Sequence, residues 1–187
     1  MSRESYQPLV HGTAAALAAG SDEEALVTFR ADSSQAAGVR SNVKIRDFTV
    51  PVDEPPTLGG LNSAPNPVEY ALAALATCQE ITYRLHADAL GIPLDGVSVS
   101  LEGDIDLRGF FGVDDSIRPG FKAIRGTVEL TSPASDAELQ RLRAYVDGHC
   151  PVLDLVSSPT PVTLELRSKS IRSAASVASV ASAATAG

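Results

Sequence analysis

Apolar and polar residues alternate with a period close to two along the first part of the chain. Leu26–Ala31 and Val39–Val50 both show this alternation, which is typical of half-buried antiparallel strands. Residues 53–67 are instead rich in proline, glycine and asparagine, and this composition predicts a loop. Two strands followed by a loop are therefore expected before the next change of pattern.

A long helix is predicted to follow this loop, from Val68 to about Leu90. Asn66 has the position of an N-cap, and Glu69 three residues later completes a capping box. The helix is apolar on nearly all sides, which predicts burial all round. At 1.5 Å per residue it is about 35 Å long, so we expect a second subunit to cover part of it. Gly91 is expected to end the helix.

The remaining elements follow from the same kinds of pattern. Residues 97–107 and 121–131 are predicted to form a hairpin, and residues 135–148 form an amphipathic helix that begins with a second capping box. A short helical turn is expected after Cys150, and Thr160–Arg167 is predicted to be a closing strand. The predicted order of strands and helices, β-β-α-β-β-α-β, indicates an α+β fold.

The chain of 187 residues has the length of one domain. We expect residues 1–25 to be an N-terminal extension, residues 26–167 to form a single domain, and residues 168–187 to be a peripheral tail. From Ser173 onward the tail consists mainly of alanine, serine and valine and has no bulky side chain to anchor it.

Net charge and hydropathy exclude several classes of function. The chain has 15 basic and 23 acidic residues, a formal net charge of −8, and no cluster of Lys or Arg. Binding to nucleic acid or to an anionic membrane surface is therefore not expected. No signal-peptide pattern and no run of 18 apolar residues is visible. The expected compartment is the cytoplasm.

Two cysteines, Cys78 and Cys150, are the main candidates for chemistry. Two cysteines with scattered histidines do not form a zinc site of the usual spacing, so no metal is expected. Cys78 lies in the apolar helix, where a cysteine can simply pack as a small hydrophobic residue. Cys150 precedes Pro151 at a predicted helix N-cap, where a thiolate is favoured. If the two sulfurs meet, one can attack a substrate and the other can resolve the oxidised product as a disulfide.

Two blocks of sequence resemble the OsmC/Ohr family of osmotically induced and organic-hydroperoxide-resistance proteins. They are the block from Leu58 to Cys78, which contains Asn-Pro-Val-Glu-Tyr-Ala-Leu-Ala-Ala-Leu-Ala-Thr-Cys, and the later His149-Cys-Pro-Val. The resemblance extends over about residues 26–167. It implies an intertwined homodimer, in which antiparallel sheets wrap two long central helices and two thiol sites lie at the dimer interface. It also implies peroxide reduction without metal, haem or flavin.

The resemblance implies a role for each cysteine. Cys78 would be the peroxidatic thiolate that attacks a small hydrophobic peroxide, an organic or fatty-acyl hydroperoxide, and Cys150 would resolve the sulfenic acid. A dithiol would return the electrons. Such a protein would belong to the response to oxidative stress.

The resemblance also implies an arginine beside the thiol, held by a glutamate directly after the Asn-Pro pair. Here that position is Val68, and the acid follows one residue later as Glu69, about 100° further around a helix. Glu69 is therefore a candidate partner for the arginine as well as a capping residue. Arg46 is the first candidate for the arginine and Arg40 is the second.

Two other functions are compatible with the same residues. In one, the protein is a non-catalytic module that binds a hydrophobic ligand, and the cysteines only pack. In the other, the disulfide acts as a redox sensor that changes a surface for a partner protein.

Overall fold

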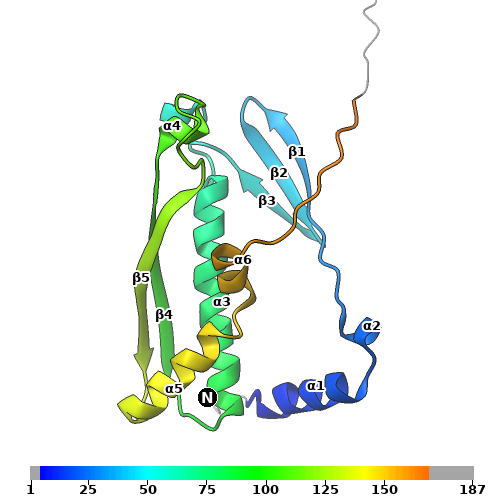
Figure 1. Ribbon diagram of the computed structural model, residues 1–187, viewed down its shortest axis with the longest axis vertical. Coiled ribbons are helices and arrows are strands. Elements are labelled where there is room, and N and C mark those ends of the chain that lie inside the picture. The colour runs from blue at the N-terminus through cyan, green and yellow to red at the C-terminus, as the bar shows by residue number, and fades with distance from the viewer. Residues whose placement is uncertain (1–4, 169–187) are drawn as a thin grey trace, which may run out of the picture.

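The computed structural model describes residues 5–168 of the chain. Its fold is α+β, as predicted, with two antiparallel sheets and the long helix α3, Pro67–Ala89, in the centre (Figure 1). The side chain of Asn66 accepts a hydrogen bond from the Glu69 amide and the Glu69 carboxylate accepts one from the Asn66 amide. The predicted capping box and the predicted start of the helix are therefore confirmed.

One side of α3 faces a two-stranded sheet made of β4, Gly96–Ile105, and β5, Phe121–Thr131 (Figure 1). The tip of this hairpin contains the short helix α4, Leu107–Phe110. Helices α5, Asp136–Asp147, and α6, Pro151–Ser157, pack against α3. The predicted hairpin, the predicted amphipathic helix and the predicted turn after Cys150 are thus all present.

A second sheet has three antiparallel strands in the order β1, Asp32–Ala37, then β2, Arg40–Ile45, and β3, Phe48–Val52. The prediction of one continuous strand over Val39–Val50 is wrong, because the chain turns at Arg46 and Asp47. Arg46 has a φ of 54°, a left-handed conformation that non-glycine residues rarely adopt. This reversal creates the β2–β3 hairpin. A loop with one turn of 3-10 helix, Pro56–Leu58, then leads to α3.

The segments at the two ends of the described chain differ from the prediction. Leu26–Ala31 and Thr160–Arg167 were expected to be strands, but neither belongs to a sheet in the single chain. An extended segment becomes a strand only when a neighbouring strand satisfies its backbone groups, and the described part of one chain supplies none. Two helices precede the first sheet, α1, Gln7–Ala19, and α2, Asp22–Ala25. Of the predicted tail, residues 169–187 lie outside the described residues.

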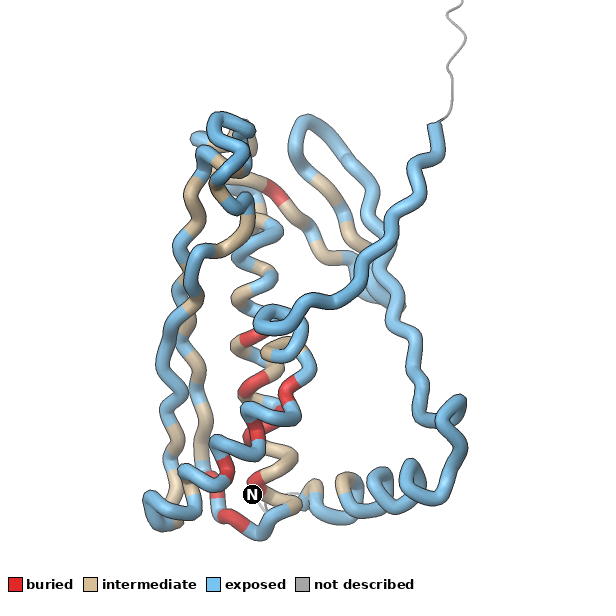
Figure 2. Tube along the Cα trace, in the orientation of Figure 1, coloured by how far each residue is buried: buried red, intermediate tan, exposed pale blue. Residues whose placement is uncertain are grey.

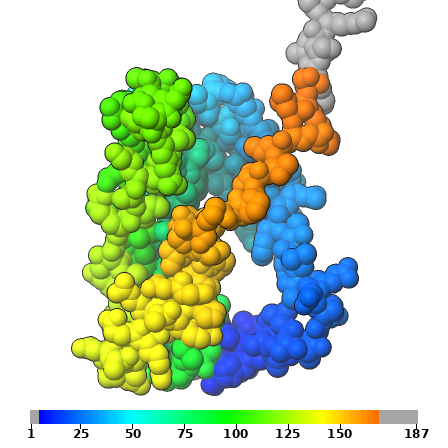
Figure 3. Space-filling view, in the orientation of Figure 1, coloured from blue at the N-terminus to red at the C-terminus, as the bar shows by residue number. Residues whose placement is uncertain are grey.

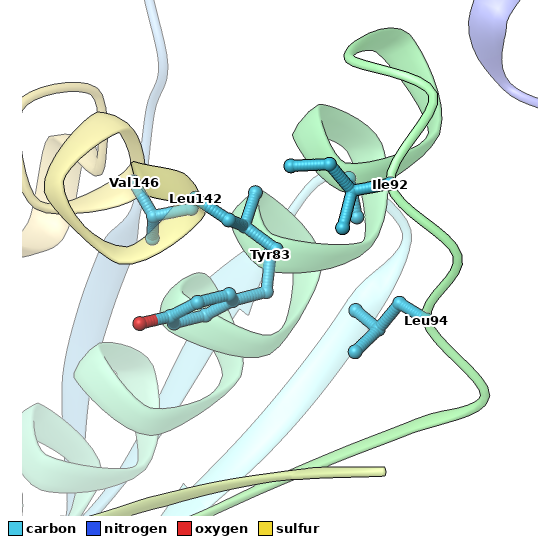
Figure 4. Close-up of a cluster of buried hydrophobic side chains, with 6 residues drawn as sticks. Tyr83, Ile92, Leu94, Leu142 and Val146 are labelled. Atoms are coloured by element: carbon cyan, nitrogen blue, oxygen red, sulfur yellow. The ribbon is translucent and has the colours of Figure 1, made fainter. Parts of the chain in front are cut away.

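The hydrophobic core lies where α3 meets α5. Fully buried side chains from both helices and from the segment before β4 form one cluster that includes Tyr83, Leu94, Leu142 and Val146 (Figure 4). Figure 2 shows that buried residues are concentrated along α3 and α5, whereas the sheet β1–β3 is mostly exposed. This core fixes the end of α5 against α3, and α5 leads directly to Cys150.

The single chain does not bury α3 on every side. Ile81, in the middle of the helix, keeps 60% of its surface exposed. Figure 3 shows an open gap bordered by α1, the segment before β1 and the C-terminal segment. The sequence prediction of burial all round is therefore not met within one chain. Among the described helices, none is long and apolar enough to cross a membrane.

Candidate functional site

The two cysteines lie side by side in the folded chain. Cys78 belongs to α3, and Cys150 is the N-cap residue of α6. The Cys150 thiol donates a hydrogen bond to the Cys78 sulfur, with the two Sγ atoms 3.4 Å apart. Cys150 is 2% exposed and Cys78 is half-buried. Because an S–S bond is about 2.05 Å long, a movement of about 1.4 Å would bring the sulfurs to bonding distance.

The surroundings of Cys78 act on its pKa in both directions. Burial raises the pKa of the Cys78 thiol above its ordinary value, and the neighbouring Cys150 thiol raises it further. A hydrogen bond from the Val152 amide, in the first turn of α6, lowers the pKa of Cys78, and the Thr82 hydroxyl does so as well. No cation is among the groups that shift this pKa within residues 5–168. The net effect is a raised pKa, so residues 5–168 of one chain do not favour the Cys78 thiolate.

The sequence analysis missed the role of Val152. The N-terminus of the helix after Cys150 was expected to act on Cys150 itself, but its Val152 amide acts on Cys78. Spacing along the sequence could not reveal this contact, because it depends on how α6 packs against α3. The one signal in the sequence was that Cys150 lies at a predicted helix N-terminus.

Glu69 is engaged in the helix cap. Its carboxylate accepts a hydrogen bond of 2.8 Å from the Asn66 amide, and its own amide donates to the Asn66 side chain at 2.9 Å. Glu69 precedes Cys78 by nine residues on α3, which corresponds to about 13.5 Å along the helix axis. The structure therefore does not bring Glu69 to the thiol of the same chain.

Arg46 and Arg40 both belong to the sheet β1–β3. Arg40 is the first residue of β2 and Arg46 follows the last one. The Arg46 guanidinium carbon lies 5.1 Å from the centre of the Phe48 ring. This sheet stands apart from α3 in Figure 1. Neither arginine is among the groups that shift the pKa of Cys78, so one chain does not bring the predicted cation to the thiol.

The loop before α3 is organised by a buried carboxylate, that of Asp53. Its Oδ2 accepts hydrogen bonds from the Leu61 amide at 3.2 Å and from the Ser63 amide and hydroxyl at 3.0 and 2.7 Å. These bonds and one from the Glu54 amide lower the pKa of Asp53 to about 2, against the effect of its desolvation. Asp53 thus holds the loop in the shape that delivers the chain to the start of α3.

The surface next to Cys150 is hollowed. A cavity of about 700 Å³ is lined by residues from the end of α5 and from α6, among them His149, Cys150 and Leu153. The His149 ring stacks on Tyr145 with ring centres 4.0 Å apart. In residues 5–168 no group of three or more histidine, cysteine, aspartate or glutamate side chains is arranged to hold a metal ion. The site presents two adjacent thiols, those of Cys78 and Cys150.

Comparison with known families gives one match, the family described as OsmC-like protein, over residues 60–165. This range is more than half of the chain and contains both cysteines, α3 and the β4–β5 hairpin. A comparison with curated protein sequences gives no match.

Several solved structures have a similar fold. An OsmC-like protein from Mycoplasma pneumoniae matches with a TM-score of 0.60 and 19% identity, over 70% of this chain and 87% of that chain. An organic hydroperoxide resistance protein OsmC from Legionella pneumophila gives a TM-score of 0.56 and 24% identity, over 71% and 90% of the two chains. An organic hydroperoxide resistance protein from Elizabethkingia anophelis matches with a TM-score of 0.53 and 20% identity, over 71% of this chain and 89% of that chain.

Proposed function

Because this chain belongs to the OsmC-like protein family, we propose that it is a thiol-dependent peroxidase that reduces organic or fatty-acyl hydroperoxides. The observation that carries the proposal is the 3.4 Å separation of the Cys78 and Cys150 sulfurs. Two of the structural neighbours are organic hydroperoxide resistance proteins, which supports this substrate class.

The proposed reaction begins with attack by the Cys78 thiolate on the terminal oxygen of the hydroperoxide. The O–O bond breaks, an S–O bond forms, and the leaving alkoxide takes a proton to become an alcohol. The Cys150 thiol then attacks the sulfur of the resulting sulfenic acid, and water leaves as the disulfide forms. The peroxide gains two electrons and the two cysteines lose them.

Turnover then needs an external reductant. We assign this role to a dithiol, which reduces the Cys78–Cys150 disulfide by thiol–disulfide exchange and becomes a disulfide itself. Cys150 is among the residues that line the cavity at the start of α6, and we propose that the dithiol enters there.

Activation of Cys78 requires a cation, and residues 5–168 of one chain place none among the groups that shift its pKa. A buried thiol is a weak nucleophile until a positive charge stabilises its thiolate. We propose that the protein forms an intertwined homodimer and that the sheet β1–β3 of a second copy brings Arg46, or else Arg40, to the thiol.

The exposed apolar residues of the single chain support this assembly. Val162, Leu164 and Leu166 are between 77% and 94% exposed and alternate with polar residues, as in a half-buried strand. Leu26 and Phe29 are 80% and 91% exposed in the other extended segment without a strand partner. Contact with a second copy would bury these side chains and provide the missing strand neighbours.

Peroxide consumption in the presence of a dithiol tests the proposal. We expect the wild-type chain to consume cumene hydroperoxide with dihydrolipoamide as reductant, and Cys78→Ser to lose this activity. Arg46→Ala is expected to reduce the rate at neutral pH tenfold or more, with Arg40→Ala as the matched variant for the second candidate. Consumption that survives Cys78→Ser would remove this residue from the reaction, and no consumption by the wild type would leave a binding or sensing role.

A further inference from the structure

Three aromatic rings meet where the end of α5 packs against α3. The His149 ring stacks on the Tyr145 ring, with the ring centres 4.0 Å apart and an interplanar angle of 7°. The His86 ring lies 4.9 Å from the Tyr145 ring and 5.7 Å from the His149 ring, measured between centres. His149 directly precedes Cys150, and His86 belongs to the same helix as Cys78. The ring contact therefore joins the two segments that carry the two sulfurs.

The surroundings of the two histidines differ. The Nδ1 atom of His149 lies 2.7 Å from the Tyr145 carbonyl oxygen. A carbonyl oxygen only accepts, so Nδ1 donates this bond and Nε2 can take up a proton without breaking it. His149 is exposed, whereas His86 is half-buried. Burial lowers the pKa of His86 below its ordinary value of 6.5, and the neighbouring His149 lowers it further. Protonation of His86 is therefore opposed by its surroundings.

Other ionisable groups lie on the helices packed around these rings. Asp147 and Asp154 line the same cavity as His149, and Asp147 is paired with Arg143 at 3.6 Å. On α1, the Nε2 atom of His11 lies 3.1 Å from the carbonyl oxygen of the last residue of α3. Aspartate and arginine normally keep their charges between about pH 5 and pH 7.5. His11, like any histidine, can take up a proton in this range, and it therefore serves as a control.

We propose that the contact among these three rings positions Cys150 for disulfide formation, and that protonation of both histidines weakens it. Two positive charges on rings with centres 5.7 Å apart repel each other, and this repulsion acts between α3 and the segment that leads to Cys150. A disulfide requires the two sulfurs to come about 1.4 Å closer than their separation of 3.4 Å. The oxidised pair therefore tolerates the repulsion less than the two thiols do. Acid should disfavour the disulfide relative to the dithiol.

Exchange with an external dithiol measures this coupling. Dihydrolipoamide gives two electrons and two protons to the Cys78–Cys150 disulfide and becomes lipoamide, as its own S–S bond forms. Thiols are mostly protonated below about pH 7.5, so the exchange takes up no net proton from solution. Its equilibrium constant is then independent of pH, unless another titrating group is linked to it. The inference rests on the proposed Cys78–Cys150 pair, but not on a peroxide as the oxidant.

The exchange equilibrium between the full-length protein and the lipoamide–dihydrolipoamide couple tests the proposal. It is measured at pH 7.5, 6.5, 5.5 and 5, approached from the oxidised and from the reduced protein, by alkylation of free thiols and mass spectrometry. In the wild type, we expect the constant for disulfide formation to fall about threefold to tenfold from pH 7.5 to pH 5. His86→Gln and His149→Gln each remove one of the two charges and should lose most of this fall. His11→Gln should behave like the wild type.

The outcomes separate this inference from the proposed reaction and from folding. A constant that varies less than twofold in the wild type would overturn the inference, and so would an undiminished fall in His149→Gln. Since His149 is exposed, this variant decides the test even if His86→Gln does not fold. Lipoamide forms the disulfide in this experiment, so a protein without peroxidase activity would still show the effect of acid.

Discussion

The sulfur of Cys150 lies 3.4 Å from the sulfur of Cys78, although 72 positions separate the two residues in the chain. Helix α3 carries the first and the start of α6 carries the second. The contact is maintained by packing of α5 against α3, where Leu142 and Val146 are fully buried. The proximity of the two sulfurs thus depends on a hydrophobic cluster that contains neither of them.

Replacing Cys150 by serine is expected to stop the reaction at the first oxidised state. Without a resolving thiol, Cys78 treated with one equivalent of cumene hydroperoxide should remain a sulfenic acid, because no disulfide can form. Dimedone labelling and mass spectrometry measure this product. The wild-type chain, treated in the same way, should lose both thiols and take up no label. If dimedone labelled the wild type as well as the variant, this result would contradict the resolving role of Cys150.

Val152→Pro is expected to slow alkylation of Cys78 severalfold at neutral pH. Proline has no amide hydrogen, and the Val152 amide is a group that lowers the pKa of Cys78. The pKa should therefore rise and the thiolate fraction should fall. The alkylation rates of Val152→Pro and of the wild type should be measured from pH 6 to 11. They should become equal at high pH, where the Cys78 thiol is ionised in both proteins. Val152→Ala keeps the amide and should behave like the wild type.

Glu69 is expected to act on stability rather than on the thiol. Glu69→Ala removes the side chain that accepts the Asn66 amide and should lower the free energy of unfolding by about 0.5–1 kcal/mol. Glu69→Gln can still accept this bond and should unfold at a denaturant concentration close to that of the wild type. Both variants should consume peroxide at the wild-type rate. A large rate loss in Glu69→Gln alone would instead assign a role to the negative charge.

Asp53 is expected to make the fold sensitive to acid. Its folded-state pKa of about 2 lies below the ordinary value of 3.8, so the unfolded chain binds a proton more readily. The stabilisation is present above about pH 4 and is lost as the pH falls toward 2. Urea unfolding at pH 7, 4, 3 and 2 should show this loss. Asp53→Asn should show a smaller decrease over the same range, and an identical decrease would exclude Asp53 as its source.

The sequence predicted those elements whose signals are local. The capping boxes that begin with Asn66 and Ser135 are present at the predicted positions, because a cap needs only residues three positions apart. Cys150 lies at the predicted N-cap position because Pro151, directly after it, favours the first turn of a helix. The turn at Arg46 was missed, since a positive φ at arginine carries none of the glycine or asparagine signal on which turn prediction relies.

The strands near the two ends were predicted from the alternation of apolar and polar residues. This alternation describes one strand and does not identify the strand that pairs with it. Leu26–Ala31 and Thr160–Arg167 have the pattern of strands and have no neighbouring strand among residues 5–168 of one chain. The pattern specifies which side chains favour burial. It does not specify which chain buries them.

By itself, the sequence determined the α+β class, the bounds of the central helix and the two thiols worth considering. The distance between those thiols, the opposing effects on the pKa of Cys78 and the engagement of Glu69 in a cap came only from the folded chain. The reason is physical: capping and periodicity arise from neighbours within a few residues. The contact between Cys78 and Cys150 instead depends on how the chain packs helix α6, which begins 73 positions after Cys78, against α3.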